Sequence, residues 1–410
     1  MRQTIYAGLA AAVLFTALPV HVQSQPAQPL SVQAESPSGM TTPAGGIPVG
    51  PLVVYPAVDL AQGYDDNLFQ RENNRQSSSF TKLSPHVRAE GRSGPNRFGF
   101  GLRIDDARYH ASPADSYTNY AITGDAELVF SGRSALRLSA AHRRATEGRG
   151  TTDRTVSPAP DEYEDTGIEG LYRYGAPGAQ GRIEVEGGAL AHRYTNNRAF
   201  TSAGDRDTLR LGGTFFWRVM PRTDLLFQAQ RGEIDYKLAG STLDSTERRL
   251  LVGAKWEATA ATTGTAKFGR MRKDFEAGGR SSVSDSSWDV GVRWSPLTYS
   301  VFDFTSSKVT SETTLVGADT VVSKAYGVLW SHAWSSRVRT QALASLRNDA
   351  FVGAGINRND DTTTFGLKVG YDFRRWLRLG AELTHYERES NLPTLDYKRN
   401  LLLFTMGATL

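Results

Sequence analysis

The sequence predicts an all-β protein, a transmembrane antiparallel up-and-down β-barrel of about 18 strands, with 16 strands as the nearest alternative. Three observations support this prediction. Apolar and polar residues alternate with a period of two in many segments, short turn sequences alternate with long polar stretches, and most tryptophans fall near the short turns. The mean hydropathy of −0.39 excludes a bundle of transmembrane helices, because each such helix needs ~20 consecutive apolar residues.

The N-terminal segment that precedes the barrel has a different composition. A basic start, an apolar run and a small residue at Ser24 predict a secretory signal peptide over residues 1–24, with a single membrane anchor as the alternative. Residues 25–51 are rich in Pro, Gly, Ser and Thr, which predicts a flexible periplasmic tether. The barrel is then expected over residues 52–410, in the bacterial outer membrane.

The alternating segments are long enough to cross a bilayer. In one of them Phe98, Phe100 and Leu102 alternate with Gly99 and Gly101, and the pattern continues on both sides. Such alternation indicates a strand with one apolar and one polar face. Strands of ~9–11 residues span a bilayer at a tilt, whereas strands of soluble proteins usually have ~5–6 residues. A wide closed barrel satisfies this pattern with lipid outside and polar groups inside.

The turns set the number and order of the strands. Eight short turn sequences, about 40 residues apart, alternate with longer polar stretches, so each spacing corresponds to one hairpin. The short turns are expected at residues 92–97, 131–134, 174–181, 220–223, 259–262, 295–298, 334–337 and 373–376. The strands are expected to be centred near residues 58, 84, 102, 124, 139, 168, 187, 213, 229, 252, 267, 290, 303, 327, 342, 367, 381 and 403.

Aromatic residues indicate where the wall meets the membrane interface. Six of the seven tryptophans lie at or near the short turns, which predicts an aromatic girdle at the periplasmic end. These are Trp217, Trp256, Trp294, Trp330, Trp334 and Trp376. The last segment alternates Leu402, Phe404 and Met406 on one face, which is the kind of final strand that barrel-insertion machinery recognises.

If the apolar faces point outward, charged residues in the strands point into the lumen. The basic candidates are Lys82, Arg88, Arg103, Arg137, Arg143, Arg210, Arg218, Arg249, Lys255, Arg293, Arg337, Arg339, Arg347, Lys368, Arg378 and Arg399. The acidic candidates are Asp105, Asp125, Glu127, Glu169, Glu184, Glu186, Glu257, Asp289 and Glu382. The basic set is the larger, so the lumen is expected to attract anions, unless the arginines pair with neighbouring carboxylates and brace the wall.

One predicted strand carries this hypothesis furthest. Arg337, Arg339 and Arg347 share one face, and the opposite face is small and mostly apolar. An arginine that faced lipid near the midplane would cost ~2–4 kcal/mol, so the arginine face is expected to point inward. We expect these residues to form part of an anion-guiding wall.

A short motif follows the first predicted strand. Gly63, Asp65, Asp66 and Asn67 lie in the order GxDDN, which resembles a motif of the putative β-barrel porin type 2 family. The segments at 84–92 and 115–130 are similar as well, so the resemblance covers roughly residues 52–410. It implies an outer-membrane barrel often linked to exopolysaccharide or capsule secretion, and it carries no catalytic residues. The three polar side chains of the motif suit either a divalent cation or an Asx turn that ends the strand.

Three functions follow as expectations. The first, implied by the resemblance, is a pore of an exopolysaccharide secretion system, with anionic polysaccharide and periplasmic export components as partners. The second is a general diffusion porin for small anionic solutes, and the third is a structural or adhesive barrel with a plugged lumen. Outer-membrane lipids, lipopolysaccharide and the insertion machinery are expected partners in each case.

Other functional classes find little support in the sequence. The absence of Cys excludes thiolate sites, and no dense Lys/Arg block suggests nucleic-acid binding. No histidine motif for metal binding and no GxSxG sequence occurs, so we expect no enzyme, no metal and no cofactor. His192 and His385, near strand ends, could join a Ser/His/Asp site only if the fold brought the three groups together.

Overall fold

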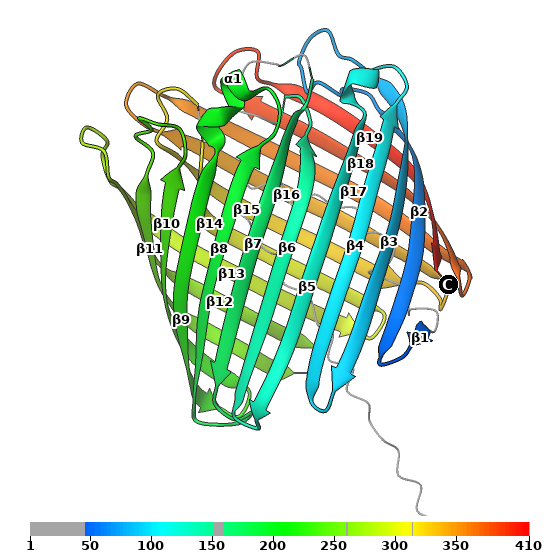
Figure 1. Cartoon of the computed structure of the whole chain (residues 1–410), viewed down its shortest axis with the longest axis vertical. Coiled ribbons are helices and arrows are strands. Elements are labelled where there is room, and N and C mark those ends of the chain that lie inside the picture. Colours follow the sequence, from blue (N-terminus) through cyan, green and yellow to red (C-terminus); the bar gives the residue numbers. More distant parts are fainter. Residues whose placement is uncertain (1–45, 151–156, 158, 260, 314, 410) are drawn as a thin grey trace, which may run out of the picture.

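The computed structural model describes residues 46–409 except 151–156, 158, 260 and 314, and the predicted signal peptide lies outside these residues. The described chain forms one continuous antiparallel sheet that closes into a tilted barrel (Figure 1). Strands β2 to β19 follow one another around the wall in sequence order, so the predicted number of 18 strands is confirmed. Among the described residues, no helix is long and apolar enough to span a membrane.

Every expected strand centre falls in a separate strand. The strands of the wall are β2 Leu52–Asp65, β3 Ser78–Ser93, β4 Asn96–Tyr109, β5 Tyr117–Ser131, β6 Ser134–Glu147, β7 Asp161–Tyr174, β8 Gly181–Tyr194, β9 Arg206–Met220, β10 Thr223–Tyr236, β11 Ser245–Thr259, β12 Thr262–Phe275, β13 Val283–Leu297, β14 Ser300–Ser311, β15 Thr320–Ala333, β16 Val338–Val352, β17 Arg358–Arg374, β18 Leu377–Ser390 and β19 Tyr397–Thr409. In the described parts of the long loops there are three short helical segments, η2 Pro113–Asp115, α1 Arg198–Thr201 and η3 Ser202–Gly204.

One short turn lies further along the chain than expected. The sequence placed it at residues 295–298, but β13 continues to Leu297 and pairs there with Ser300 at the start of β14. The pairing register shifts after Trp294, which is the signature of a bulge. A bulge accommodates Pro296 next to the end of the strand, where a proline without an N–H is tolerated.

Closure of the barrel joins the two ends of the described chain. β19 pairs with β2 from Leu401 opposite Asp65 to Thr409 opposite Ala57. Beyond that point the edge of β2 is covered by a short strand, β1 Ile47–Val49, whose Ile47 pairs with Val54. Of the expected tether over residues 25–51, only residues 46–51 are described, and they include β1, which pairs with backbone groups of β2 that would otherwise form an open strand edge.

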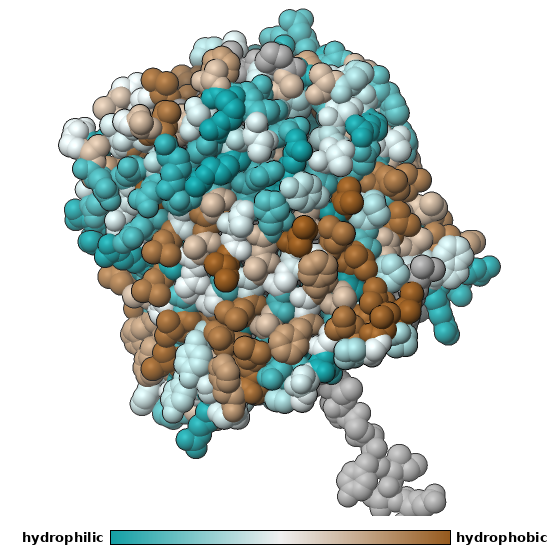
Figure 2. Space-filling view, in the orientation of Figure 1, coloured by the Kyte–Doolittle hydropathy of each residue, from teal (hydrophilic) through white to brown (hydrophobic). Residues whose placement is uncertain are grey.

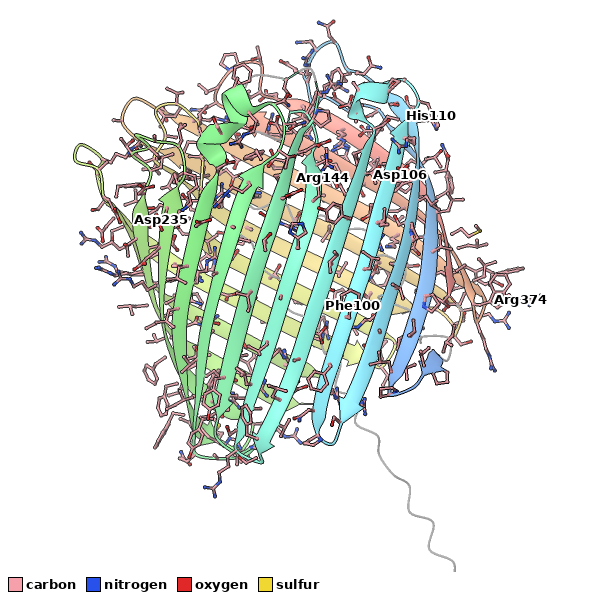
Figure 3. All side chains as sticks on the ribbon, viewed as in Figure 1. Phe100, Asp106, His110, Arg144, Asp235 and Arg374 are labelled. Atoms are coloured by element: carbon pink, nitrogen blue, oxygen red, sulfur yellow. The ribbon has the colours of Figure 1, made fainter. Side chains whose placement is uncertain are left out.

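The register assigns the two faces of the wall. Residues paired directly across neighbouring strands point to the same side, and Leu102 pairs with Val87 on β3 and with Ile122 on β5. These side chains belong to the outer surface, on which Phe100 is 51% exposed (Figure 3). On the side of the barrel that is visible, Figure 2 shows an apolar band with a hydrophilic zone above it, toward the long loops. A lipid-facing surface explains so many exposed apolar side chains.

The aromatic girdle lies where the sequence placed it. Trp294 stacks on Phe302 with ring centroids 5.3 Å apart, and Phe302 lies 6.3 Å from Trp330. Trp330 in turn contacts Trp334, edge to face, at 6.4 Å. All these rings sit near the short-turn ends of β13 to β16, so they form one patch of the expected interfacial belt.

Candidate site on the inner face of the barrel

Charged side chains that alternate with the outer apolar residues point into the barrel. In β9, Arg210 and Arg218 lie on the face opposite to Leu209 and Leu211, which are 54% and 63% exposed. The same alternation, read through the pairing registers, places nearly all the predicted basic residues inside. They are Lys82, Arg88, Arg103, Arg137, Arg143, Arg210, Arg218, Arg249, Lys255, Arg293, Arg339, Arg347, Lys368, Arg378 and Arg399.

Arg337 departs from this set. It lies in the exposed turn between β15 and β16, before the strand begins at Val338. The predicted row of three arginines therefore reduces to Arg339 and Arg347 on β16. The alternation of the sequence continues through a short turn, so it does not show where the strand begins.

Arg347 is built into the wall. Its side chain is 4% exposed, and Nε donates to Oδ1 of Asp349 at 2.8 Å. A second nitrogen donates to the Ser323 hydroxyl at 3.4 Å, and that hydroxyl donates to Asp349 at 2.6 Å. These contacts favour the bracing role over an anion-guiding role for this arginine.

The inner face also holds many carboxylates that the sequence reasoning missed. Several lie two residues from an arginine on the same strand, as Asp349 does from Arg347 and Asp360 from Arg358. Because residues i and i+2 of a strand share a face, this spacing was the signal that could have found them. The carboxylates missed on the inner face include Asp59, Asp65, Glu90, Asp165, Asp224, Asp303, Asp349, Asp360 and Asp372. The expected surplus of positive charge is therefore largely compensated.

Most of these groups pair across neighbouring strands. Arg143 of β6 contacts Asp165 of β7 at 2.6 Å, and Arg293 of β13 contacts Asp303 of β14 at 2.7 Å. Short, charge-assisted contacts of this kind hold both side chains against the wall. The inner face is thus a lattice of opposite charges, in which single cations stand out only locally.

Strand β11 carries two such cations. Arg249 donates to the Ser287 hydroxyl at 2.7 Å and to the Trp288 carbonyl at 3.1 Å, both neutral acceptors. Lys255 lies on the same inner face, three alternate positions nearer the short turn. Among the residues that the structure describes, no carboxylate forms an ion pair with either cation. This part of the lining can attract an anion.

The outer end of β14 leaves the wall and crosses the inner face. Pairing between β13 and β14 stops at Trp288 opposite Lys308, and the last residues of β14 pair with β15 alone. Thr310 donates to Glu247 of β11 at 2.5 Å. Glu312 then accepts from the Tyr236 hydroxyl of β10 at 2.8 Å and pairs with Lys273 of β12. The bend brings the start of the β14–β15 loop into the outer half of the barrel.

The carboxylate of Glu312 fits this position electrostatically. Burial alone would raise its pKa, but the Lys273 ammonium and the Tyr236 hydroxyl, with a contribution from Arg206, hold the pKa below its usual value. Lys273 is fully buried, so the two charges depend on each other.

The GxDDN motif closes the barrel. Asp65 is fully buried and pairs with Arg399 of β19 at 2.5 Å, and its Oδ1 accepts from the Asn67 N–H at 3.0 Å in an Asx turn. The Asn67 side chain donates to the Lys398 carbonyl at 2.8 Å. Asp66 accepts from the backbone and side chain of Asn400, both at 2.6 Å. The motif therefore joins β2 to β19 across the closure.

Glycine is required at the start of the same motif. A Cβ on Gly63 would lie 2.2 Å from the Phe80 ring of β3. The carboxylates of the motif are engaged in these contacts. Within the described residues, no group of three or more His, Asp or Glu side chains is arranged to hold a metal ion.

The two histidines considered for a hydrolytic site lie on opposite sides of the wall. His192 is buried inside, with Nδ1 2.6 Å from Asp165, and its Nε2 has no hydrogen-bond partner among the described residues. His385 lies on the outer face, where it contacts the Asn400 side chain at 2.8 Å. Among the described residues, His192 and Asp165 therefore lack the contact between Nε2 and a hydroxyl group that a Ser/His/Asp triad has.

Solved structures resemble the fold. The outer membrane protein OpdK from Pseudomonas aeruginosa aligns with a TM-score of 0.51 and 10% sequence identity, over 87% of this chain and 99% of that chain. OpdK with vanillate gives a TM-score of 0.52, also with 10% identity over 87% and 99% of the two chains. OpdO from the same organism gives 0.51, with 11% identity over 87% and 97%. At such identities the likeness shows the fold alone, a closed antiparallel β-barrel.

Sequence relationships give the family. No curated protein matches the chain. Residues 42–409 match the family described as putative beta-barrel porin 2, and this range includes β1 and the whole wall from β2 to β19. The resemblance predicted from Gly63, Asp65, Asp66 and Asn67 is confirmed. The chain therefore belongs to the putative beta-barrel porin 2 family.

Proposed function

We propose that the protein is a passive channel of the bacterial outer membrane for small anionic solutes, and not an enzyme. The single observation that supports this proposal most is the inner face, a lattice of ion pairs in which Arg249 and Lys255 of β11 form no ion pair with any described residue, although the carboxylates of Asp289 and Glu247 lie near Arg249. Paired charges keep the lining hydrated without binding a solute tightly. The two cations of β11 then give the path a preference for negative charge.

The bend of β14 supports selection by size. The contacts of Thr310 and Glu312 with β10, β11 and β12 hold this segment against the inner face in the outer half of the barrel. Because a segment on the inner face takes up part of the lumen, we expect a solute to pass a narrower region before it reaches Lys255, which lies nearer the short turns. A channel with a narrow region followed by cationic groups suits the passage of small anions.

Ion selectivity in planar bilayers tests the proposal. With a potassium chloride gradient, the purified barrel should conduct and show a reversal potential that indicates a preference for chloride. Lys255→Glu should shift the reversal potential toward potassium. Arg337→Glu is the matched control, because it makes the same change of charge in the exposed turn and should leave the reversal potential unchanged. A barrel that does not conduct, or an unchanged reversal potential in Lys255→Glu, would contradict the proposal.

Polysaccharide export is the second candidate, and its support is the family resemblance together with aromatic rings on the inner face. Tyr109 of β4 and Tyr117 of β5 lie with their ring centroids 6.5 Å apart, and Tyr109 packs on the buried Phe80 ring at 4.9 Å. Aromatic faces are surfaces on which sugar rings can pack. Deletion of the gene should then abolish polymer on the cell surface, and the wild-type chain should restore it. Unchanged polymer in the deletion strain would exclude this role.

A further inference from the structure

Four arginines form a compact group on the outer face of β10, β11 and β12. Arg231 lies directly opposite Arg248, and Arg248 lies directly opposite Arg272. Arg270 lies on the same face of β12, two residues before Arg272, and pairs with Leu250. Directly paired residues have Cβ atoms ~5 Å apart, so Arg248 lies beside both Arg231 and Arg272.

Internal ion pairs compensate only part of this charge. Arg231 contacts Glu233 at 2.7 Å and Arg272 contacts Asp274 at 2.7 Å, while Arg248 lies 3.9 Å from Asp274. Arg270 forms no ion pair with any described residue. Four cations therefore share two carboxylates. Like charges opposite one another destabilise a sheet, so an external anion is needed to offset the repulsion.

The group is open to a ligand. The side chains of Arg231, Arg248 and Arg272 are 55%, 58% and 58% exposed, and Arg270 is exposed as well. Arg231 lies eight residues along β10 from its short-turn end, which corresponds to about 20 Å of height for a strand tilted by ~40°. The apolar band of such barrels is ~25 Å tall, so the arginines lie near its outer border.

Exposed apolar side chains continue below the arginines on the same strands. Leu250, Val252, Phe268 and Phe227 are 64%, 56%, 55% and 51% exposed. They pair in a row, with Phe227 opposite Val252 and Val252 opposite Phe268. The surface thus has a cationic upper part and an apolar lower part. The hydrophilic zone over the apolar band in Figure 2 shows the same arrangement on the visible side of the barrel.

We propose that Arg231, Arg248, Arg270 and Arg272 bind the phosphorylated headgroup of an outer-leaflet glycolipid, the lipid A part of lipopolysaccharide. Guanidinium groups bind phosphate with charge-assisted, bidentate hydrogen bonds. The acyl chains of the same molecule then lie on Leu250, Val252 and Phe268. A free phosphate ion would contact the arginines but not the apolar row, whereas lipid A would contact both.

Native mass spectrometry of the full-length barrel tests this site. Purified protein is mixed with bis-phosphorylated lipid A, and the number of bound molecules and their affinity are measured. Changing all four arginines to glutamine should remove the tightest binding step or weaken it at least about tenfold, the effect of losing ~1.4 kcal/mol of charge-assisted bonding. Lipid A without phosphates should bind the variant and the wild type equally.

Arg144→Gln combined with Arg193→Gln provides the control. These arginines also lie on the outer face toward the long loops, but each already pairs with a carboxylate, Glu162 and Asp207. The control should bind lipid A like the wild type. Inorganic phosphate at millimolar concentration should not displace lipid A, and displacement would identify a simple anion site instead.

Two further outcomes would overturn the proposal. Equal binding of lipid A by the wild type and the fourfold variant excludes the site. A change in the number of protein chains per particle, with lipid binding unaltered, assigns the arginines to a protein contact. Heat-modifiable migration on a denaturing gel checks that the variant is folded, and unchanged channel conductance is expected because these residues lie on the face opposite to the lining.

Discussion

Asp65 shows how a single side chain can determine whether the wall closes. Both oxygens of its carboxylate accept hydrogen bonds from Arg399, and one of them also accepts from the Asn67 N–H. These contacts lie where β2 pairs with β19, the pairing that joins the two ends of the described wall. A buried charge that loses its partner is strongly destabilising, whereas an exposed hydrogen bond is worth much less. The adjacent aspartates of the motif therefore have unequal importance.

Asp65→Asn should destabilise the barrel by about 3–5 kcal/mol, because Arg399 would keep its charge without a counter-ion. Asp66→Asn should cost about 1 kcal/mol, since Asp66 accepts hydrogen bonds from the exposed Asn400 alone. Urea unfolding followed by tryptophan fluorescence measures both. Equal losses in the two variants would show that the motif does not act through the Arg399 pair.

Glu312 gives the outer half of the barrel a dependence on acidity. Its folded pKa lies below the ordinary value of 4.5, so the ion pair with Lys273 contributes its full stabilisation above the unfolded pKa. That contribution is lost as the pH falls through the lowered folded pKa. The wild type should therefore lose stability below about pH 4.5 more steeply than Glu312→Gln. Urea midpoints between pH 3 and 7 test this, and parallel curves would exclude Glu312 as the cause.

At the scale of an element, β16 shows that arginines in one alternating row can have different roles, bracing the wall or facing the lumen. Arg339 and Arg347 share the inner face of the strand, but Arg347 lies among Asp349 and Ser323, and Arg337 lies outside the strand. The period of two predicted the face correctly. It could not predict burial, because burial depends on neighbours from β15 and β17 that are paired through long-range register.

Charge reversal along this element should give graded results. Arg347→Glu would place a carboxylate beside the 8% exposed Asp349, so it should lower the yield of folded barrel several-fold. Arg337→Glu should leave the yield unchanged, because that side chain is exposed in the turn. The folded fraction on a heat-modifiability gel compares the two. A normal yield of folded Arg347→Glu would show that Arg347 does not brace the wall and would favour the anion-guiding role.

At the scale of the whole molecule, the sequence predicts what the bilayer imposes. Strand length, alternation and the position of Trp294 and Trp330 follow from a lipid-facing wall, and all of them are local in sequence. Contacts between distant strands could not be predicted. The inward bend at Glu312 depends on Tyr236 and Lys273, which are 76 and 39 residues away in the chain.

The balance of charge inside the barrel also depends on contacts between strands, and this balance determines the expected ion selectivity. Because most arginines of the inner face pair with carboxylates, we expect the field that reaches a passing ion to come mainly from Arg249 and Lys255 of β11. Such a field extends over about 10 Å at 0.1 M salt and about 3 Å at 1 M. The anion preference of the channel should therefore be measurable at low salt and nearly vanish at high salt.

Reversal potentials at a fixed ratio of potassium chloride, with absolute concentrations near 0.1 M and near 1 M, measure this loss of preference. Lys255→Glu should lower the chloride preference at the low concentration and differ little from the wild type at the high one. Arg337→Glu should follow the wild type at both. A preference that persists unchanged at high salt would mean that the solute contacts Lys255 or Arg249 directly, because contact pairs in a narrow lining are screened far less than charges acting across water.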